Sequence, residues 1–317
     1  MVHTARCLPQ DQEGTFHVFA HVAGPEGYNP LKDDAAARQL LDTVIFFAAA
    51  YCCRIYSVAI MGNHWHGVIR FEAPRPMERA ELRQRADLLY PGALMQERLD
   101  CWDEECWEHF RKRLFSLSEF MRNVQGAFAQ WYNNASPRKG RFWADRYGSN
   151  QLLDELSMLF VMAYVDLNSV RSGLCDRPQD HPYSSLYLRE AGLDGWLEPL
   201  ETLLGGSREG ALRQYKSMVY YLGNIPREGK GRISDELLHE AEKRGFASEG
   251  AFRKRIGYFS TGLAMGPREA VREVLNYRRS KGVYKRRKNP LSVQEESELC
   301  VARRERLTKP KRVTLPV

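Results

Sequence analysis

The sequence predicts a mixed α+β fold, and two observations support this. Residues 15–71 carry the patterns of a strand, a helix and two further strands, whereas residues 76–134 are mostly helical in pattern. The chain has 317 residues, 43% of them hydrophobic and 27% charged. A folded protein of one large domain or two moderate ones is therefore expected.

Local sequence patterns predict the first three strands and the first helix. Residues 15–22 alternate loosely between apolar and polar side chains, which predicts a strand. Asp33 or Asp34 can cap a helix over residues 35–51, which is rich in Ala, Leu and Phe. Residues 54–61 and 64–71 are β-branched and aromatic, so they predict two more strands joined at Gly62 and Asn63.

Helices dominate the rest of the sequence. An amphipathic stripe predicts a buried helical face and comprises Leu114, Leu117, Phe120, Met121, Val124 and Phe128. Residues 135–140 break this pattern, residues 141–149 form a polar and aromatic loop, and a strongly apolar helix is expected over residues 152–167. Short helices are then predicted over 208–221, 234–244, 249–256 and 267–279, beyond a boundary at 205–230.

The positive charge of the chain is concentrated at its C-terminal end. The net charge is +7, yet residues 271–317 hold fourteen Lys or Arg and five Glu, a net of +9. The preceding residues hold 33 basic and 35 acidic side chains, a net of −2. Basic tails often bind nucleic acid, although they also serve as solubilising ends. We expect a flexible tail from Lys281 that adds non-specific affinity for DNA.

The apolar runs, the first residues and the cysteines indicate where in the cell the protein is expected. The longest apolar run, near residues 44–53, is shorter than the roughly 20 residues that a membrane span needs. The first residues show no signal-peptide pattern. The seven cysteines include no pair with CxxC spacing, so the sequence suggests neither a disulfide framework nor a structural zinc site. The expected location is the cytoplasm, in association with the nucleoid.

The sharpest chemical motif is the segment Asn63-His64-Trp65-His66. Alternate residues of a strand share one face, so His64 and His66 would project together. Two neutral imidazoles side by side can hold one divalent ion. The same spacing also occurs in half-exposed strands that bind no metal, so the pair alone leaves both interpretations open.

A second motif lies on the apolar helix. Tyr164 and Asn168 are four residues apart, so they lie on one face of a helix, one turn from each other. A phenol beside an amide oxygen could supply a nucleophile and a metal ligand. A core tyrosine with an Asn at the helix C-terminus is the alternative. Asp166 would point away from this face, as a solvated or structural residue.

Taken together, the motifs resemble those of HUH endonucleases with one catalytic tyrosine, and more closely the REP-associated tyrosine transposases. Four stretches in the family's order carry the resemblance, over roughly residues 14–188: SVAIMGNHWHGVIRF, GRFWADRYGS, AYVDLNSVRSGLC and HPYSSLY. Gly62 and Ser169 replace prolines that are usual in the family, and the segment 73–108 is longer than in compact members. Neither replacement removes a catalytic atom.

The resemblance implies a ferredoxin-like HUH domain with an antiparallel sheet, with the histidines on a central strand and the tyrosine on a helix packed against it. It further implies a metal-dependent enzyme that nicks and joins single-stranded DNA near hairpins. Tyr164 would be the nucleophile, forming a 5′-phosphotyrosine, and His64, His66 and Asn168 would hold Mg²⁺ or Mn²⁺.

The loop of the second stretch is the expected contact with DNA, because it combines cations with aromatic rings. Its expected DNA-binding residues are Arg138, Lys139, Arg141, Trp143, Arg146 and Tyr147. The domain division expected is 1–205 for the transposase or endonuclease domain, 206–280 for a small helical extension and 281–317 for the tail. Two other functions stay open, a non-catalytic DNA-binding relative and a metal-dependent nuclease that does not use the tyrosine. A monomer and a homodimer are both compatible with the sequence.

Overall fold

One sheet of seven strands organises the residues that the structure describes, which are 13–136, 140–243, 262–281, 291–292 and 299–303 of this computed structural model. The strands are β1 (Gly14–His21), β2 (Cys53–Ile60), β3 (His64–Phe71), β4 (Gly148–Leu152), β5 (Gly262–Pro267), β6 (Leu291–Ser292) and β7 (Leu299–Arg303). They lie in the order β2-β3-β1-β4-β5-β7-β6. Neighbouring strands are antiparallel except β4 and β5, which are parallel.

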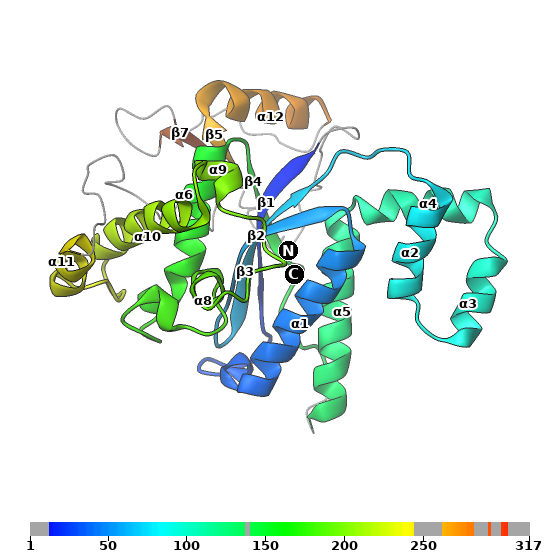
Figure 1. Ribbon diagram of the computed structural model, residues 1–317, viewed down its shortest axis with the longest axis horizontal. Coiled ribbons are helices and arrows are strands. Elements are labelled where there is room, and N and C mark those ends of the chain that lie inside the picture. The colour runs from blue at the N-terminus through cyan, green and yellow to red at the C-terminus, as the bar shows by residue number, and fades with distance from the viewer. Residues whose placement is uncertain (1–12, 137–139, 244–261, 282–290, 293–298, 304–317) are drawn as a thin grey trace, which may run out of the picture.

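The helices pack on both faces of this sheet and beyond its ends (Figure 1). They are α1 (Asp34–Ala50), α2 (Arg79–Leu89), α3 (Ala93–Asp100), α4 (Glu104–Leu114), α5 (Leu117–Ala135), α6 (Glu155–Asp166), α7 (Asn168–Arg171), α8 (Ser185–Glu190), α9 (Glu201–Leu204), α10 (Arg208–Asn224), α11 (Asp235–Lys243) and α12 (Arg268–Ser280), with 3₁₀ turns at Pro30–Lys32 and Pro178–Asp180. None of the described helices has the length and hydropathy of a membrane span.

The first four strands form a ferredoxin-like unit. The chain runs β1, α1, β2, β3, α5, β4, and these strands lie side by side as β2-β3-β1-β4 with every pair antiparallel. The predicted α+β fold and its strand-helix-strand-strand start are confirmed. Strand β4 was not predicted, because its sequence GSNQL lacks apolar alternation and becomes a strand through pairing with β1.

The two faces of the central strands pack against different helices. On β3, Trp65 and Ile69 belong to the core under α1 and α5, whereas Val68 belongs to the core under α6. Strand β1 alternates in the same way, with Phe16 and Val18 in the core under α1 and α5. The sheet is therefore the middle layer of three, and α6 lies over the face that carries the even-numbered residues of β3.

Capping residues set the ends of the helices that cover the first face. The Asp33 carboxylate accepts a hydrogen bond from the Ala36 N–H at 2.9 Å, and the Ser116 hydroxyl accepts one from Glu119 N–H. The predicted amphipathic stripe is buried as expected. Its first member, Leu114, ends α4, and the others lie on α5.

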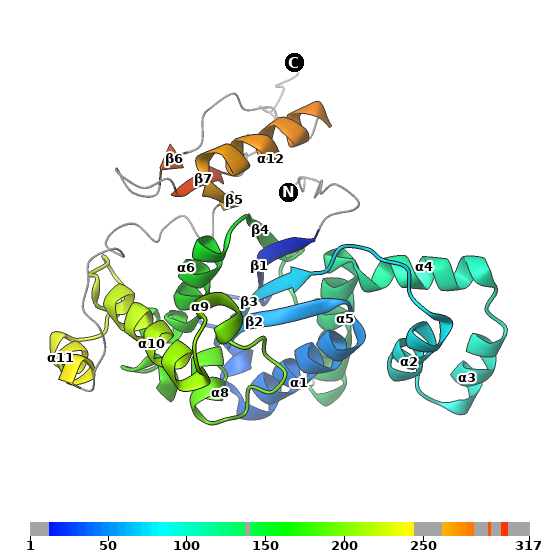
Figure 2. The same ribbon diagram turned by 45° about the horizontal axis from the view of Figure 1, so that its top comes forward.

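The long segment after β3 forms a separate helical layer beside the sheet (Figure 2). Helices α2, α3 and α4 share a small core of their own, made by Leu82, Ala86, Leu99, Trp107, Phe110 and Leu114 together with Cys52 from the start of the sheet region. This core explains how the chain accommodates a segment longer than the motif pattern led us to expect.

The C-terminal region differs in part from the prediction. Helices α10, α11 and α12 confirm three of the four predicted there, and the fourth, 249–256, lies outside the described residues. Strands β5 and β7 were not predicted, and β6 and β7 lie within the tail that begins at Lys281. Both strands are too short to show periodicity, and they form because β4 offers β5 an edge to pair with. The three-part domain division stays a prediction.

A buried carboxylate joins α6 to its neighbours. Asp166 is fully buried, so it is structural rather than solvated. Its Oδ1 accepts hydrogen bonds from the Ser185 hydroxyl at 2.8 Å and the Leu186 N–H at 3.0 Å, and its Oδ2 accepts one from the Tyr215 hydroxyl at 2.5 Å. Burial raises the pKa of this carboxyl. The network connects α6 with α8 and α10 and so holds α6 in place over the sheet.

We expect Asp166→Ala to lower the free energy of unfolding by about 2–4 kcal/mol, because it leaves three buried donors without an acceptor. Asp166→Asn should cost less, since its amide oxygen still accepts from Ser185 and Leu186. Urea denaturation of the three proteins measures both effects. A change below about 0.5 kcal/mol in the alanine variant would contradict the role given to this network.

Candidate active site

Four histidines line up on the face of the sheet under α6. The pairing register sets Phe19 of β1 opposite His66 of β3, and His21 opposite His64. The ring centroids are 5.1 Å apart for His21 and His64, and 5.0 Å for His64 and His66. His17 follows at 5.1 Å from His66. The row runs from the buried His17 to the exposed His21 at the strand end.

Helix α6 brings Tyr164 onto this row. Its half-buried phenol ring meets His66 edge-on, with 5.7 Å between the ring centroids, and meets His17 at 5.8 Å. His64, His66 and Tyr164 were singled out in sequence segments that are far apart. The fold places them in one cluster, on a central strand and on the helix packed against it.

The imidazoles of this cluster are neutral at neutral pH. Burial, aided by the nearby charges of His21 and Lys230, lowers the pKa of His64 to about 4. Burial and the neighbouring His17 hold the pKa of His66 well below its ordinary value. A neutral imidazole has a free lone pair, which is the form that binds a metal ion.

In His64 and His66 the ring nitrogen Nδ1 has a hydrogen-bond partner, which leaves Nε2 available on both rings. His64 Nδ1 lies 2.7 Å from Asn63 Oδ1, and His66 Nδ1 lies 3.0 Å from His17 Nε2. If each Nδ1 carries the proton and donates it, Nε2 of both rings is the free donor atom. Ligating histidines commonly donate their second ring N–H in this manner. Among the described residues, no three His, Cys, Asp or Glu side chains form a cluster that could hold a metal ion.

Asn168 is placed one turn beyond Tyr164, as its spacing predicted. Its side-chain nitrogen donates to the Tyr164 carbonyl at 2.9 Å, which satisfies a carbonyl at the C-terminal end of α6. With the nitrogen so engaged, Oδ1 is the atom that could bind a metal ion. The role of Asn168 as a ligand stays a prediction.

The basic loop lies beside the histidine row, but its aromatic rings face inward. Ala144 N–H donates to the His21 carbonyl at 2.9 Å, so the loop runs along the end of β1. Arg141 and Arg146 are exposed there. Trp143 and Tyr147 are buried in the core under α1 and α5, and their expected role in binding DNA stays a prediction. Arg138 and Lys139 lie outside the described residues.

The sequence analysis missed His17 and His21. A signal was present, since residues 17, 19 and 21 share one face of the predicted strand, and that face is polar and aromatic while the other is apolar. The alternation alone could not show that this face meets His64 and His66. That contact depends on the register between β1 and β3.

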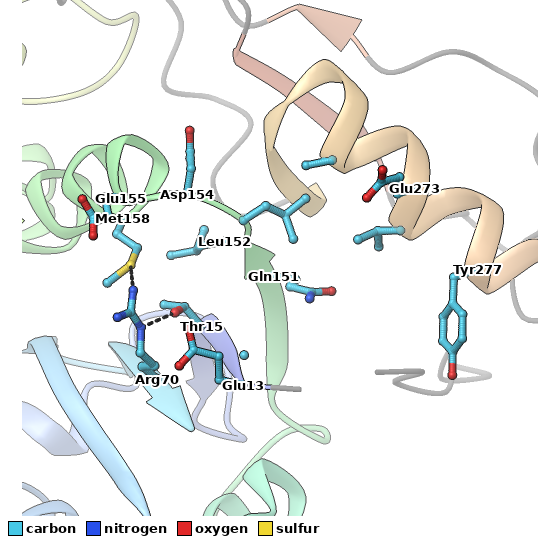
Figure 3. Close-up of a pocket in the computed structure, with 14 residues that line it drawn as sticks. Glu13, Thr15, Arg70, Gln151, Leu152, Asp154, Glu155, Met158, Glu273 and Tyr277 are labelled. Atoms are coloured by element: carbon cyan, nitrogen blue, oxygen red, sulfur yellow. Dashed lines mark hydrogen bonds between the residues drawn. The ribbon is translucent and has the colours of Figure 1, made fainter. Parts of the chain in front are cut away.

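A separate cavity of about 480 Å³ lies at the other end of α6 (Figure 3). Arg70 points into this region and donates to Thr15 Oγ1 at 3.0 Å and to Met158 Sδ at 3.1 Å. Four carboxylates line the cavity, from Glu13, Asp154, Glu155 and Glu273. Their charge would repel a phosphate backbone, so we place the candidate active site at the histidine end.

The comparisons with known proteins found a likeness among solved structures. The sequence matches no protein-family model and no curated protein. Among solved structures, it is similar to one described as a REP-associated tyrosine transposase bound to a REP hairpin. The two chains are 13% identical, the match covers 61% of this chain and 88% of the other, and the TM-score is 0.42. We therefore develop the function from the geometry of this chain.

The ring of Phe19 packs beside His66, with 5.9 Å between the ring centroids. On its other side it packs so closely on Gly148 that no larger residue fits there. A Cβ added at Gly148 would lie 2.2 Å from Phe19 Cζ. We expect Gly148→Ala to displace this ring and to cost about 1–3 kcal/mol of stability, measured by urea denaturation.

Gly126→Ala is the matched control, because an added Cβ there meets nothing within 4 Å. In the exposed helical position of Gly126 it should stabilise the protein by about 0.5–1 kcal/mol. Equal stability of Gly148→Ala and the wild type would show that Phe19 is not held by this contact.

Proposed function

We propose that this chain is a metal-dependent enzyme that cleaves and rejoins single-stranded DNA at hairpin-associated sites, with Tyr164 as the nucleophile. The observation that carries the proposal is the contact of Tyr164 with His66 and His17, which joins a phenol on α6 to the histidine row on the sheet, where burial favours the neutral form of His66. This combination provides a nucleophile next to donor atoms for a divalent ion.

The phenol oxygen of Tyr164 would attack the phosphorus of a phosphodiester. The new bond joins that oxygen to phosphorus, and the bond from phosphorus to the 3′ oxygen breaks. The tyrosine loses its proton and the 3′ oxygen gains one, so the products are a 5′-phosphotyrosine and a free 3′-hydroxyl. Because the ester bond is conserved, a 3′-hydroxyl can attack in the reverse direction and rejoin or transfer the strand.

The donor set fits a divalent ion held mainly by substrate and solvent oxygens. His64 and His66 would bind it through Nε2, and Asn168 through Oδ1, with His17 orienting His66 through the 3.0 Å hydrogen bond. Mg²⁺ or Mn²⁺ suits phosphate oxygens. When bound, the ion would polarise the scissile phosphate.

Arg141 and Arg146 would hold the DNA backbone next to this centre. Both side chains are exposed on the loop that hydrogen-bonds to the His21 carbonyl. Phosphate contacts from arginine position a strand without reading its sequence. Trp143 and Tyr147 would support the loop from beneath, as their burial indicates.

The nucleophile is tested with labelled single-stranded hairpin DNA, Mn²⁺ and a denaturing gel. Wild-type protein should cleave the DNA and carry a covalent adduct. Tyr164→Phe should lose both by at least about 10³-fold, because no other atom replaces the phenol oxygen, yet it should bind DNA normally. Tyr147→Phe is the control, since its hydroxyl donates a hydrogen bond to Ser118 Oγ at 3.4 Å.

The outcome separates the three functions. Cleavage without an adduct in Tyr164→Phe would indicate a metal-dependent nuclease that does not use the tyrosine. DNA binding by the wild type without cleavage would indicate a non-catalytic DNA-binding protein.

The metal ligands are tested by titrating chelator-treated protein with Mn²⁺ in a calorimeter. His64→Ala and His66→Ala should abolish measurable binding, because each removes one of two imidazole donors. His17→Ala should weaken binding about 10–100-fold through loss of the hydrogen bond that orients His66. His109→Ala, an exposed residue of α4, should bind as the wild type does. Unchanged affinity in His66→Ala would overturn the proposed metal site.

A further inference from the structure

The loop after α10 is held against α7 by hydrogen bonds. Arg171, on α7, donates to the carbonyl oxygens of Leu222 at 2.7 Å, Ile225 at 3.0 Å and Gly231 at 3.0 Å. The Gly231 N–H returns a hydrogen bond to the Arg171 carbonyl at 3.3 Å. Gly231 also lies so close to α7 that an added Cβ would meet the Val170 carbonyl oxygen at 2.2 Å. The loop of residues 225–231 therefore has a defined position next to α7, the short helix that follows the one carrying Tyr164.

Within this loop, Arg227 has a buried nitrogen atom that makes no hydrogen bond to any residue that the structure describes. The atom is Nη2, and the side chain as a whole is half-buried. Arg227 lies close enough to Tyr164 for the two groups to interact electrostatically, while burial lowers the pKa of the guanidinium. A buried guanidinium N–H without an acceptor is costly, and an anionic oxygen is the partner that satisfies it best.

Lys230 extends the positive charge toward the histidines. A turn brings the Lys230 N–H to 3.2 Å from the Arg227 carbonyl. The exposed Lys230 side chain lies near enough to His64 to affect the pKa of that imidazole. Arg227 and Lys230 therefore place two cations next to the nucleophile and next to a proposed metal ligand. The imidazoles themselves are neutral and contribute no positive charge.

We propose that Arg227 binds the phosphodiester group that Tyr164 attacks, assisted by Lys230, so that the segment after the ferredoxin-like unit completes the active site. This inference rests on the proposed function and identifies the group that holds the scissile phosphate. A guanidinium offers two N–H donors to phosphate oxygens and stabilises the charge on them during attack. The occupant is thus a phosphodiester of single-stranded DNA.

The test compares Arg227→Ala and Arg227→Lys with Arg232→Ala. Arg232 is an exposed arginine of the same connection, paired with Asp235 at 3.2 Å, and it makes the matched control. Binding of a single-stranded oligonucleotide is measured in chelator at several salt concentrations. Arg227→Ala should reduce the slope of log affinity against log salt by about 0.7, the value for one phosphate contact. An unchanged slope, or an equal reduction in Arg232→Ala, would overturn the proposal.

A second measurement follows adduct formation in a single turnover at saturating DNA and Mn²⁺. Arg227→Ala should be slower by about 10²–10³-fold, with partial activity in Arg227→Lys. A wild-type rate in Arg227→Ala would refute the inference and leave the proposed function intact. If the wild type forms no adduct, the proposed function fails, and the salt slope still decides whether Arg227 contacts phosphate.

Thermal unfolding distinguishes phosphate binding from a structural role. Because Arg227 Nη2 has no partner within the described part of the chain, Arg227→Ala should unfold at the wild-type temperature or above it. Arg171→Ala should unfold at a lower temperature, since it loses hydrogen bonds to three carbonyls. A large drop in the unfolding temperature of Arg227→Ala would mean that the residue supports the loop, contrary to the proposal.

Discussion

The register between β1 and β3 is the constraint on which the candidate site depends. Side chains alternate along a strand, so a shift of one residue would turn every histidine to the opposite face. The apolar face prevents this shift. Phe16 and Val18 on β1, with Trp65 and Ile69 on β3, fill the core under α1 and α5. The histidines lie on the other face because these large side chains occupy the first.

Burial then determines the chemistry of the histidine row. A low-dielectric environment disfavours the charged imidazolium, so His64 and His66 stay neutral. Neutral rings suit a metal ion but do not attract DNA. Positive charge has to come from the surrounding loops, and the described structure places Arg141, Arg227 and Lys230 on two such loops near the row.

The position of Tyr164 depends on contacts at both sides of α6. Below it, the helix packs on β2 and β3, and above it the Asp166 carboxylate joins α6 to α8 and α10. Arg171 continues this connection into the loop that carries Arg227. The residues after position 205 are therefore part of the framework that positions Tyr164. The hydrogen bonds of Arg171 also hold the loop that carries the positive charges of Arg227 and Lys230.

The sequence by itself determined the residue chemistry and the local elements. Alternation predicted β1, β-branched and aromatic composition predicted β2 and β3, and helical spacing predicted α5. The motifs singled out His64, His66, Tyr164 and Asn168. Only the tertiary structure decided which groups meet. His17 reaches His66 through strand pairing, Asp166 is buried against α8 and α10, and Trp143 turns into the core. Strands β4, β5 and β7 form on neighbouring edges although their short sequences carry little pattern. The physical reason is that periodicity reports which face of an element is buried, whereas register and burial depend on partners distant in the chain.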